Sequence, residues 1–260
     1  MKGDALLHQI TPMVITFNEA PNLRRSLDKL SWAKKILIID SGSTDQTLDI
    51  ANSYSNVEVV YRSFDSFALQ CNFGLTRVST RWVLSLDCDY ELTDELVAEL
   101  RTLQESGAAG YSASFVYRIY GHSLRGTLYP PRVVLYRAEG AVYRDEGHGH
   151  RIAVMGPTLN FVGKIFHDDR KPLACWLSTQ QRYAKQEVDY LETAPQAELC
   201  RADRLRLRGW PMPIIVFFYA LFWKRCLFDG WPGWLYALQR VAAETIIALE
   251  VVDRKIRRTQ

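Results

Sequence analysis

Residues 82–92 read WVLSLDCDYEL, a short apolar run that ends in two aspartates, Asp87 and Asp89. The run is typical of a buried strand, and a carboxylate pair at its end is costly unless something positive compensates it. Mg²⁺ and Mn²⁺ prefer oxygen ligands and usually bridge protein carboxylates to substrate phosphates. A helix-capping turn explains an Asp-x-Asp tripeptide equally well, so the surrounding pattern has to decide between the two.

Short apolar strands alternate with helical patterns over residues 12–105. The apolar runs are MVIT (13–16), KILIID (35–40), VEVVY (57–61) and WVLSL (82–86). Continuous apolar strands between amphipathic helices predict a parallel sheet that is covered on both faces. Residues 111–166 alternate polar and apolar side chains, which predicts a β-rich second half on the same sheet. Thr93 is the expected N-cap of the helix after the fourth strand, and a long helix is expected over residues 173–194.

Polar residues leave three of these strands at what should be one edge of the sheet, the carboxyl edge, where such sheets bind ligands. The first strand leads into TFNE (16–19), the second into DSGS (40–43), and the fourth into Asp87 and Asp89. Residues 41–44 lack the spacing of a dinucleotide fingerprint or a P-loop. Ordinary turn chemistry explains DSGS alone, with Thr44 or Asp45 as the expected N-cap of the next helix.

Four segments, taken in order, resemble the nucleotide-sugar-binding half of family 2 glycosyltransferases. They are VITFNEAPNLRRSL (14–27), ILIIDSGSTDQT (36–47), FALQCNFGL (67–75) and WVLSLDCDYEL (82–92). The resemblance implies the GT-A fold, an α/β domain around a mostly parallel central sheet. It is strong over residues 12–105 and looser over residues 130–190. More narrowly, the chain is similar to the bacterial branch that includes lipopolysaccharide-core β-1,4-glucosyltransferases.

The resemblance implies a role in nucleotide-sugar binding for ten residues of these segments. They are Thr16, Phe17, Asn18, Glu19, Asp40, Ser41, Gly42, Gln70, Asn72 and Asp87. Among them, Asp40 matches the aspartate that reads the uracil ring, and Phe17 keeps an aromatic side chain for base stacking. The implied donor is a UDP-hexose, with UDP-glucose as the leading choice.

The resemblance also implies a divalent cation, Mg²⁺ or Mn²⁺. Asp89 matches the metal-binding aspartate, with Asp87 beside it, and His167 matches a histidine that could reach the metal or the diphosphate. The alternative for His167 is a capping box with Asp168 and Asp169 at the start of the next helix.

The stretch YRDEGHGHRI (143–152) contains our choices for the general base. An inverting sugar transfer needs one group that takes the proton of the acceptor hydroxyl. We choose Glu146, with Asp145 second, and expect His148 and His150 to orient the base or to bind the substrate. Two alternatives remain: a zinc-chelating His-x-His pair, and a glycine-rich loop whose polar side chains are only solvated.

We divide the chain into a GT-A domain, residues 1–195, and a helical membrane-associating region, residues 196–260. Residues 210–223 lack a charge, but the run is shorter than the ~20 residues of a spanning helix. Basic and aromatic residues that suit a lipid boundary lie in and around it: Arg201, Arg204, Arg206, Arg208, Trp210, Trp223, Trp231 and Trp234. We expect peripheral, monotopic attachment at the cytoplasmic face of the bacterial inner membrane. Completion of the core and a dimer interface are the alternatives.

Composition narrows the function further. A net charge of +3 over 260 residues is too mild for a nucleic-acid binder. The cysteines, at positions 71, 88, 175, 200 and 226, form no CxxC pair, which argues against disulfides and zinc and suits a reducing cytosol. Asp4 and His8 interrupt the apolar run that a signal peptide would need, so we expect none.

The sequence therefore predicts a metal-dependent inverting glycosyltransferase. It would move a hexose to a lipid-linked or lipopolysaccharide/polysaccharide acceptor in cell-envelope biosynthesis. A nucleotidyltransferase is the first alternative, which the acidic, glycine-free loop FNEAPNL (17–23) disfavours. A non-catalytic, membrane-bound nucleotide-sugar-binding module is the second, which the retained Asp87, Asp89 and acidic pair at 145–146 disfavour.

Overall fold

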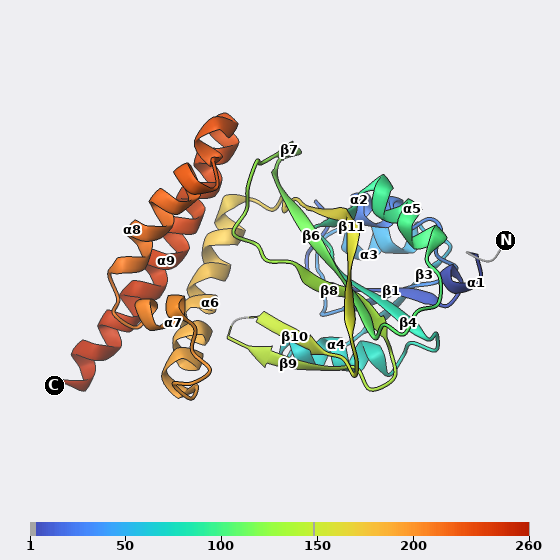
Figure 1. Ribbon diagram of the computed structural model, residues 1–260, viewed down its shortest axis with the longest axis horizontal. Coiled ribbons are helices and arrows are strands. Elements are labelled where there is room, and N and C mark those ends of the chain that lie inside the picture. The colour runs from blue at the N-terminus through green and yellow to red at the C-terminus, as the bar shows by residue number, and fades with distance from the viewer. Residues whose placement is uncertain (1–3, 148, 260) are drawn as a thin grey trace. The chain divides into compact units, whose positions relative to one another are not determined.

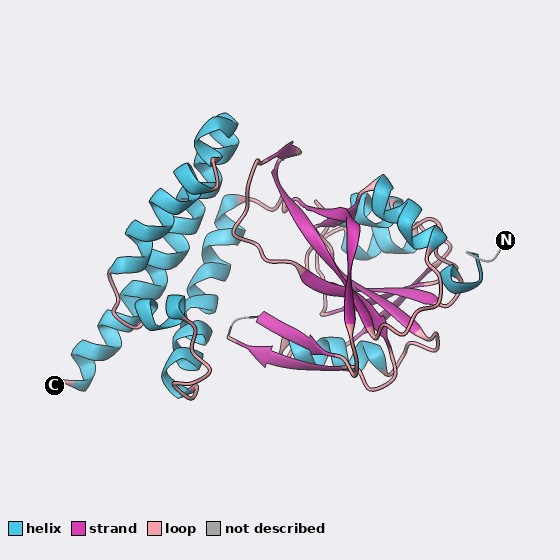
Figure 2. Ribbon diagram, viewed as in Figure 1, coloured by secondary structure: helices cyan, strands magenta, loops and turns pink. Residues whose placement is uncertain are grey.

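The computed structural model describes residues 4–147 and 149–259, and this part of the chain forms two compact units. The first unit extends to Arg118 and adds residues 129–145 and 150–170. The second unit consists of residues 119–128, the short segment that begins at Glu146, and the chain from Lys171 onward. Figure 1 labels most of the helices and strands, and Figure 2 separates helices from strands by colour. The boundary predicted after residue 195 lies within the second unit.

The first unit is built on one sheet, whose strand order is β3-β2-β1-β4-β8-β6-β11-β5. The strands are β1 (Ile10–Thr16), β2 (Ile36–Asp40), β3 (Val57–Tyr61), β4 (Trp82–Asp87), β5 (Tyr90–Leu92), β6 (Gly110–Ile119), β8 (Arg132–Arg137) and β11 (Thr158–His167). The four strands β3, β2, β1 and β4 are parallel, as predicted. β8 is antiparallel to both neighbours, and β5 is antiparallel to β11, so the sheet as a whole is mixed rather than mostly parallel.

Helices cover both faces of this sheet, as the apolar strands predict (Figure 1). One face carries α1 (Asp4–Leu7), α2 (Leu23–Asp28), α3 (Thr47–Asn52) and α5 (Asp94–Thr102). The other face carries α4 (Phe67–Leu75) and a hairpin of β9 (Val142–Glu146) and β10 (Gly149–Ala153). Successive residues of β2 show why: Ile36 and Ile38 pack into the first core, and Leu37 and Ile39 into the second.

Two helix starts test the predicted caps. Thr93 begins α5 as predicted, because its hydroxyl accepts a hydrogen bond from the backbone N–H three residues later. The N-cap of α3 is Gln46, so the prediction of Thr44 or Asp45 is wrong. The carboxylate of Asp45 instead bonds the loop after β1 and the first residue of α3, Thr47.

The second unit is helical. Its elements are α6 (Leu173–Thr193), α7 (Arg201–Arg206), α8 (Pro211–Phe218), a π-helix η1 (Tyr219–Trp223), a 3₁₀-helix η2 (Cys226–Asp229), α9 (Gly230–Arg258) and the short strand β7 (His122–Ser123). The long helix predicted after residue 172 is confirmed as α6. Among the described residues, no single helix is long and apolar enough to cross a membrane. The helical segments 211–223 and 226–258 satisfy these criteria of length and composition only when they are taken together. The chain bends by 66° between the two segments.

A buried ionic network holds three helices of the second unit together. Arg206 of α7 donates to both carboxylate oxygens of Glu244 in α9, at 2.7 and 3.0 Å. It also donates to Glu187 in α6, at 3.2 Å. Glu187 is only 7% exposed and Glu244 only 3%. Arg206 therefore has a structural role, and its expected contact with lipid is wrong.

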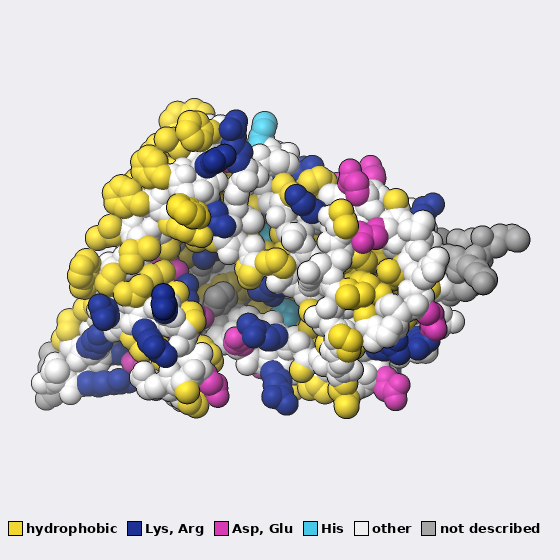
Figure 3. Space-filling model, viewed as in Figure 1, with side chains coloured by type: hydrophobic (Ala, Val, Ile, Leu, Met, Phe, Trp, Pro, Cys, Tyr) yellow, Lys and Arg dark blue, Asp and Glu magenta, His cyan; other side chains and the backbone are white. Residues whose placement is uncertain are grey.

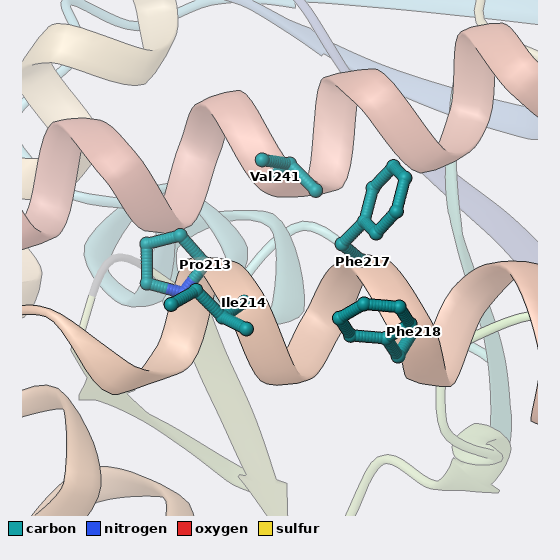
Figure 4. Close-up of a pocket in the computed structure, with 5 residues that line it drawn as sticks. All are labelled: Pro213, Ile214, Phe217, Phe218 and Val241. Carbon is teal, nitrogen blue, oxygen red and sulfur yellow. The ribbon is translucent and has the colours of Figure 1, made fainter.

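The second unit also exposes many apolar side chains. α8 and η1 bury Met212, Val216, Ala220 and Leu221 and turn another set outward. We define the apolar surface as the exposed residues Trp210, Ile214, Ile215, Phe218, Phe222, Trp223, Phe228, Trp231, Leu238, Leu249, Val252 and Ile256. Figure 3 shows apolar side chains gathered over this region. An open pocket between α8 and α9 is lined by Pro213, Ile214, Phe217, Phe218 and Val241 (Figure 4).

Candidate functional site

The turn after β2 is organised around Asp40. Its carboxylate is buried and accepts hydrogen bonds from the Thr16 hydroxyl at 2.8 Å, the backbone N–H groups of Gly42 and Ser43, and the Ser43 hydroxyl at 2.6 Å. Gly42 has a φ of 93°, which suits glycine far better than other residues. Asp40 thus fixes the end of β1 and the turn after β2 to each other. Its contact with the nucleotide base stays a prediction.

The loop after β1 is fastened to the same turn. Asn18 has a φ of 53°, its backbone N–H donates to the Ser43 hydroxyl, and its side-chain oxygen accepts from the Thr44 N–H at 2.8 Å. The N–H of Glu19 donates to a threonine hydroxyl of α3 at 2.7 Å. Phe17 is 54% exposed. An exposed aromatic ring on a fixed loop can offer its face to a planar ligand.

The two amides predicted on α4 make hydrogen bonds inside the protein. Gln70 is fully buried, donates to the Ser41 hydroxyl at 3.0 Å and accepts from the Arg62 guanidinium at 2.7 Å. Asn72 exchanges two hydrogen bonds with the backbone of Tyr143 in β9, at 2.8 and 2.9 Å. Both side chains therefore position α4 against the turn and the hairpin. A direct contact between either amide and the nucleotide stays a prediction.

Asp89 and His167 meet at the carboxyl edge. β5 and β11 are antiparallel with Tyr90 opposite His167, which brings the turn after β4 to the end of β11. The His167 Nε2 lies 3.0 Å from an Asp89 oxygen. Burial lowers the pKa of His167, but the charge and hydrogen bond of Asp89, with the charges of Asp87 and Asp169, outweigh it, so that this pKa is raised. The sequence predicted both residues at the metal, and the structure brings them together.

The alternative interpretation of His167, a helix-capping box, is wrong. His167 is the last residue of β11, and α6 begins only at Leu173, after Pro172, with no side-chain cap. The backbone N–H of Asp168 donates to the Asp89 carbonyl at 3.0 Å. The fully buried Asp168 carboxylate then accepts from the guanidinium of Arg170 at 2.8 Å.

The pair of Asp89 and His167 fits a divalent cation. The Asp89 carboxylate oxygen and the His167 Nε2 are close enough to bind one cation together. The other imidazole nitrogen of His167, Nδ1, is buried and has no hydrogen-bond partner. In the described part of the chain, no three His, Cys, Asp or Glu residues gather closely enough to hold a metal by themselves. The Asp89 carboxylate suits Mg²⁺ or Mn²⁺, because these ions take one or two carboxylates and complete their shell with phosphates and water. A metal contact for Asp87 stays a prediction.

An aromatic cluster surrounds His167, and sequence reasoning missed it. The rings of Tyr117 and Tyr129 lie 4.6 Å from the imidazole, and the ring of Tyr90 lies 5.2 Å from it. The hydroxyls of Tyr90 and Tyr129 are hydrogen-bonded, and burial raises the pKa of Tyr90 well above its usual value. These tyrosines come from different elements, so no local pattern marks them.

The two acidic residues proposed as the base have different surroundings. Both Asp145 oxygens are used at the start of α4, where they accept from the Ser66 hydroxyl at 2.7 Å and the Ala68 N–H at 3.1 Å. Glu146 is exposed and belongs to the second unit. Gly147 follows with a φ of 58°, and a Cβ there would collide with the Glu187 carboxylate. The role of either acid as a base stays a prediction.

His150 lies among aromatic rings in the first unit. Its imidazole is 5.6 Å from Phe67 and 5.2 Å from Tyr143. Burial lowers its pKa, opposed by the charge of Asp87. Burial therefore favours the neutral form of the His150 imidazole. His148 lies outside the described residues.

Comparison with known proteins agrees with this geometry. Residues 13–156, just over half of the chain, match the family model described as Glycosyl transferase family 2. The lipopolysaccharide core biosynthesis glycosyltransferase LpsC of Rhizobium meliloti (strain 1021) is 30% identical over 95 residues, which cover 35% of each protein. An uncharacterized glycosyltransferase of Rickettsia bellii (strain RML369-C) is 33% identical over 99 residues, 38% of this chain and 33% of that protein. The chain spans about a third of the length of these relatives.

A solved structure shares the fold. The mannosyltransferase PcManGT from Pyrobaculum calidifontis, in complex with GDP-Man and Mn²⁺, superposes with a TM-score of 0.55 at 16% identity, over 94% of this chain and 87% of that one. The mixed sheet, with its polar residues at the carboxyl edge, is therefore the GT-A fold that the sequence predicted. With the match over residues 13–156, we conclude that the chain belongs to glycosyl transferase family 2.

Proposed function

We propose that this chain is a metal-dependent, inverting glycosyltransferase that transfers a hexose from a nucleoside-diphosphate sugar to a lipid-linked or lipopolysaccharide acceptor in cell-envelope biosynthesis. The donor in this proposal is UDP-glucose. The observation that carries it is the pair of Asp89 and His167, 3.0 Å apart at the carboxyl edge of a GT-A sheet. The names of two similar proteins support it: LpsC acts in lipopolysaccharide core biosynthesis, and PcManGT was solved with a nucleotide sugar and Mn²⁺.

The proposed reaction is a single displacement at the anomeric carbon. The acceptor hydroxyl oxygen forms a bond to that carbon from the face opposite the diphosphate, which inverts the configuration. The bond from the carbon to the diphosphate oxygen breaks, and its electron pair stays on that oxygen. Glu146 takes the proton of the acceptor hydroxyl, a role typically worth about 10²–10⁴ in rate.

The remaining residues bind and orient the donor in this proposal. Asp89 and His167, called the metal pair from here on, would hold the Mg²⁺ or Mn²⁺, which when bound stabilises the charge of the leaving diphosphate. Phe17 offers its exposed ring to the base. Asp40 keeps the loops after β1 and β2 in place through its four hydrogen bonds, so that the nucleoside meets a rigid surface.

Attachment to the membrane is the second part of the proposal. Exposed apolar patches of more than a few hundred Å² on soluble monomers mark protein or membrane contacts. The apolar surface combines exposed Phe and Ile side chains with several tryptophans, one of which, Trp223, is 76% exposed. Lys224 and Arg225 follow directly, where they can meet anionic headgroups. We propose that these helices lie in the cytoplasmic leaflet of the bacterial inner membrane, close to a lipid-linked acceptor.

A panel of nucleotide sugars tests the reaction. The full-length protein is incubated with UDP-glucose, UDP-GlcNAc or GDP-mannose, with Mn²⁺ or EDTA, and mass spectrometry follows the products. We expect Mn²⁺-dependent release of UDP from UDP-glucose. A nucleotidyltransferase that is given UTP and a sugar phosphate would instead release pyrophosphate from the UTP. A binding module would bind UDP without turnover. Absence of metal-dependent UDP binding would refute the proposal.

A further inference from the structure

Arg132 lies at the carboxyl edge although it begins a strand. β8 runs antiparallel to β4, so its first residue, Arg132, and the last residue of β4, Asp87, belong to the same edge of the sheet. Pro130 and Pro131 precede Arg132, and their fixed φ angles restrict the backbone that leads into it. The sequence pattern gave no reason to single out this arginine.

Contacts connect Arg132 to the metal pair. Its guanidinium lies over the ring of Tyr129, 4.8 Å from the centroid. The same ring lies 4.6 Å from His167, whose Nε2 is 3.0 Å from Asp89. The positive charge of Arg132 also acts on His150, together with the negative charge of Asp87. Arg132 therefore belongs to one cluster with Asp87, Asp89 and His167.

The chemistry of the proposed reaction suits a guanidinium here. The diphosphate gains negative charge as its bond to the anomeric carbon breaks. Arginine presents a planar set of N–H donors that matches phosphate oxygens, and it stays protonated throughout. A cation that is already oriented by an aromatic ring stabilises such charge with little reorganisation.

We propose that Arg132 binds the diphosphate of the donor and stabilises it as it leaves. This inference rests on the proposed function and deepens it. The arginine donates hydrogen bonds to the diphosphate oxygens and transfers no proton. The electron pair of the broken bond stays on the diphosphate, and the acceptor proton goes to the base.

Binding of UDP and of uridine to the same variants separates a diphosphate contact from a general effect on the site. Isothermal titration in the presence of Mn²⁺ compares the wild type with Arg132→Gln and Arg132→Lys. Arg81→Gln is the matched control, because Arg81 precedes β4 at the opposite end of the strand and pairs with Glu105. Circular dichroism establishes that each variant is folded.

We expect Arg132→Gln to weaken UDP binding about tenfold or more, since it removes charge-assisted hydrogen bonds. Uridine, which has no phosphate, should bind as it does to the wild type, and Arg132→Lys should recover part of the UDP affinity. UDP binding unchanged in Arg132→Gln would overturn the inference and leave the proposed function standing. So would equal losses for UDP and uridine. A wild type that binds no UDP, GDP or ADP with Mn²⁺ would refute the function and the inference together.

Discussion

The two units differ in how they use charged side chains and in how many large apolar side chains their helices expose. In the first unit, the apolar residues of β1, β2 and β4 fill two cores, and the acidic residues stand at the edge where the strands end. In the second unit, Glu187 and Glu244 are buried and bonded to Arg206, and phenylalanine and tryptophan side chains are exposed. The first unit follows the usual partition between core and water. The second unit adds a large set of exposed apolar side chains on its helices, and the proposal that these helices bind lipid rests on that set.

Charged residues also have different partners in the two units. At the carboxyl edge, Asp89 and His167 form a pair, and among the described residues no third His, Cys, Asp or Glu joins them in a group that could hold a metal. In the second unit, Arg206 is enclosed by the carboxylates of three helices. The first arrangement is suited to binding and chemistry, and the second to holding helices together. Four predictions test this difference, from the largest expected effect to the smallest.

Replacing Arg206 should cause the largest loss of stability. Arg206→Met leaves the buried Glu187 and Glu244 without their guanidinium, which should lower the free energy of unfolding by about 3–5 kcal/mol. Urea denaturation followed by circular dichroism measures the change. Arg257→Met is the control, because Arg257 forms an exposed pair with Asp253 and should cost no more than about 1 kcal/mol. Equal stability of the two variants would show that the network contributes little.

Replacing Asp89 should abolish metal-dependent turnover. Asp89→Asn keeps the size of the side chain but removes a charge from the metal pair, and we expect a rate loss of about 10²–10³-fold or more. The rate of UDP release is measured over a range of Mn²⁺ concentrations. Asp94→Asn, at the exposed start of α5, is the matched control and should keep its activity. A folded Asp89→Asn variant with wild-type turnover would contradict the metal assignment.

Replacing the neighbouring acids Asp145 and Glu146 should have different effects, one on stability and the other on activity. Glu146→Gln should lower the transfer rate by about 10²-fold and leave UDP binding unchanged, as expected for the loss of a general base. Asp145→Asn should weaken the cap of α4 and lower stability by about 1 kcal/mol. Transfer kinetics and thermal unfolding are measured on both variants. If only Asp145→Asn slows transfer, our choice of base is wrong.

Replacing one exposed aromatic residue should weaken binding to lipid. Trp223→Ser removes a side chain whose burial in a bilayer is worth about 1.5–3 kcal/mol, so partition to anionic liposomes should fall about tenfold. Co-sedimentation with phosphatidylglycerol vesicles measures it. Val162→Ser, an exposed apolar position in the first unit, should bind like the wild type. A full-length protein that ignores these vesicles would disprove the membrane proposal.

Local patterns predicted the elements that depend on near neighbours. The apolar runs gave the four parallel strands, and Thr93 gave the start of α5. The strand order beyond β4 was out of reach, because an alternating pattern shows that a strand has two faces without naming its partners. This is why the sheet is more antiparallel than expected. Arg132 escaped notice for the same reason, since only an antiparallel strand brings its first residue to the carboxyl edge.

Two residues show how tertiary contacts decide roles. Asp145 and Glu146 are adjacent and chemically alike, but the carboxylate of Asp145 lies at the start of α4, where backbone N–H groups need acceptors. Arg206 stands in a basic stretch that looks suited to lipid, and it is instead held by Glu187 and Glu244. Neither contact is local in sequence, so the pattern around each residue could not predict it.

By itself, the sequence determined the family, the parallel half of the sheet and the acidic residues at the strand ends. Each depends on hydrophobic periodicity or on motifs within a few residues, which local backbone geometry fixes. Only the tertiary structure decided that His167 ends a strand and meets Asp89, and that Arg132 stands on the same edge with Tyr129. Those contacts follow from the pairing of β11 with β5 and of β8 with β4. Pairing between distant strands is a property of the whole folded sheet, because it depends on which apolar faces can be buried together.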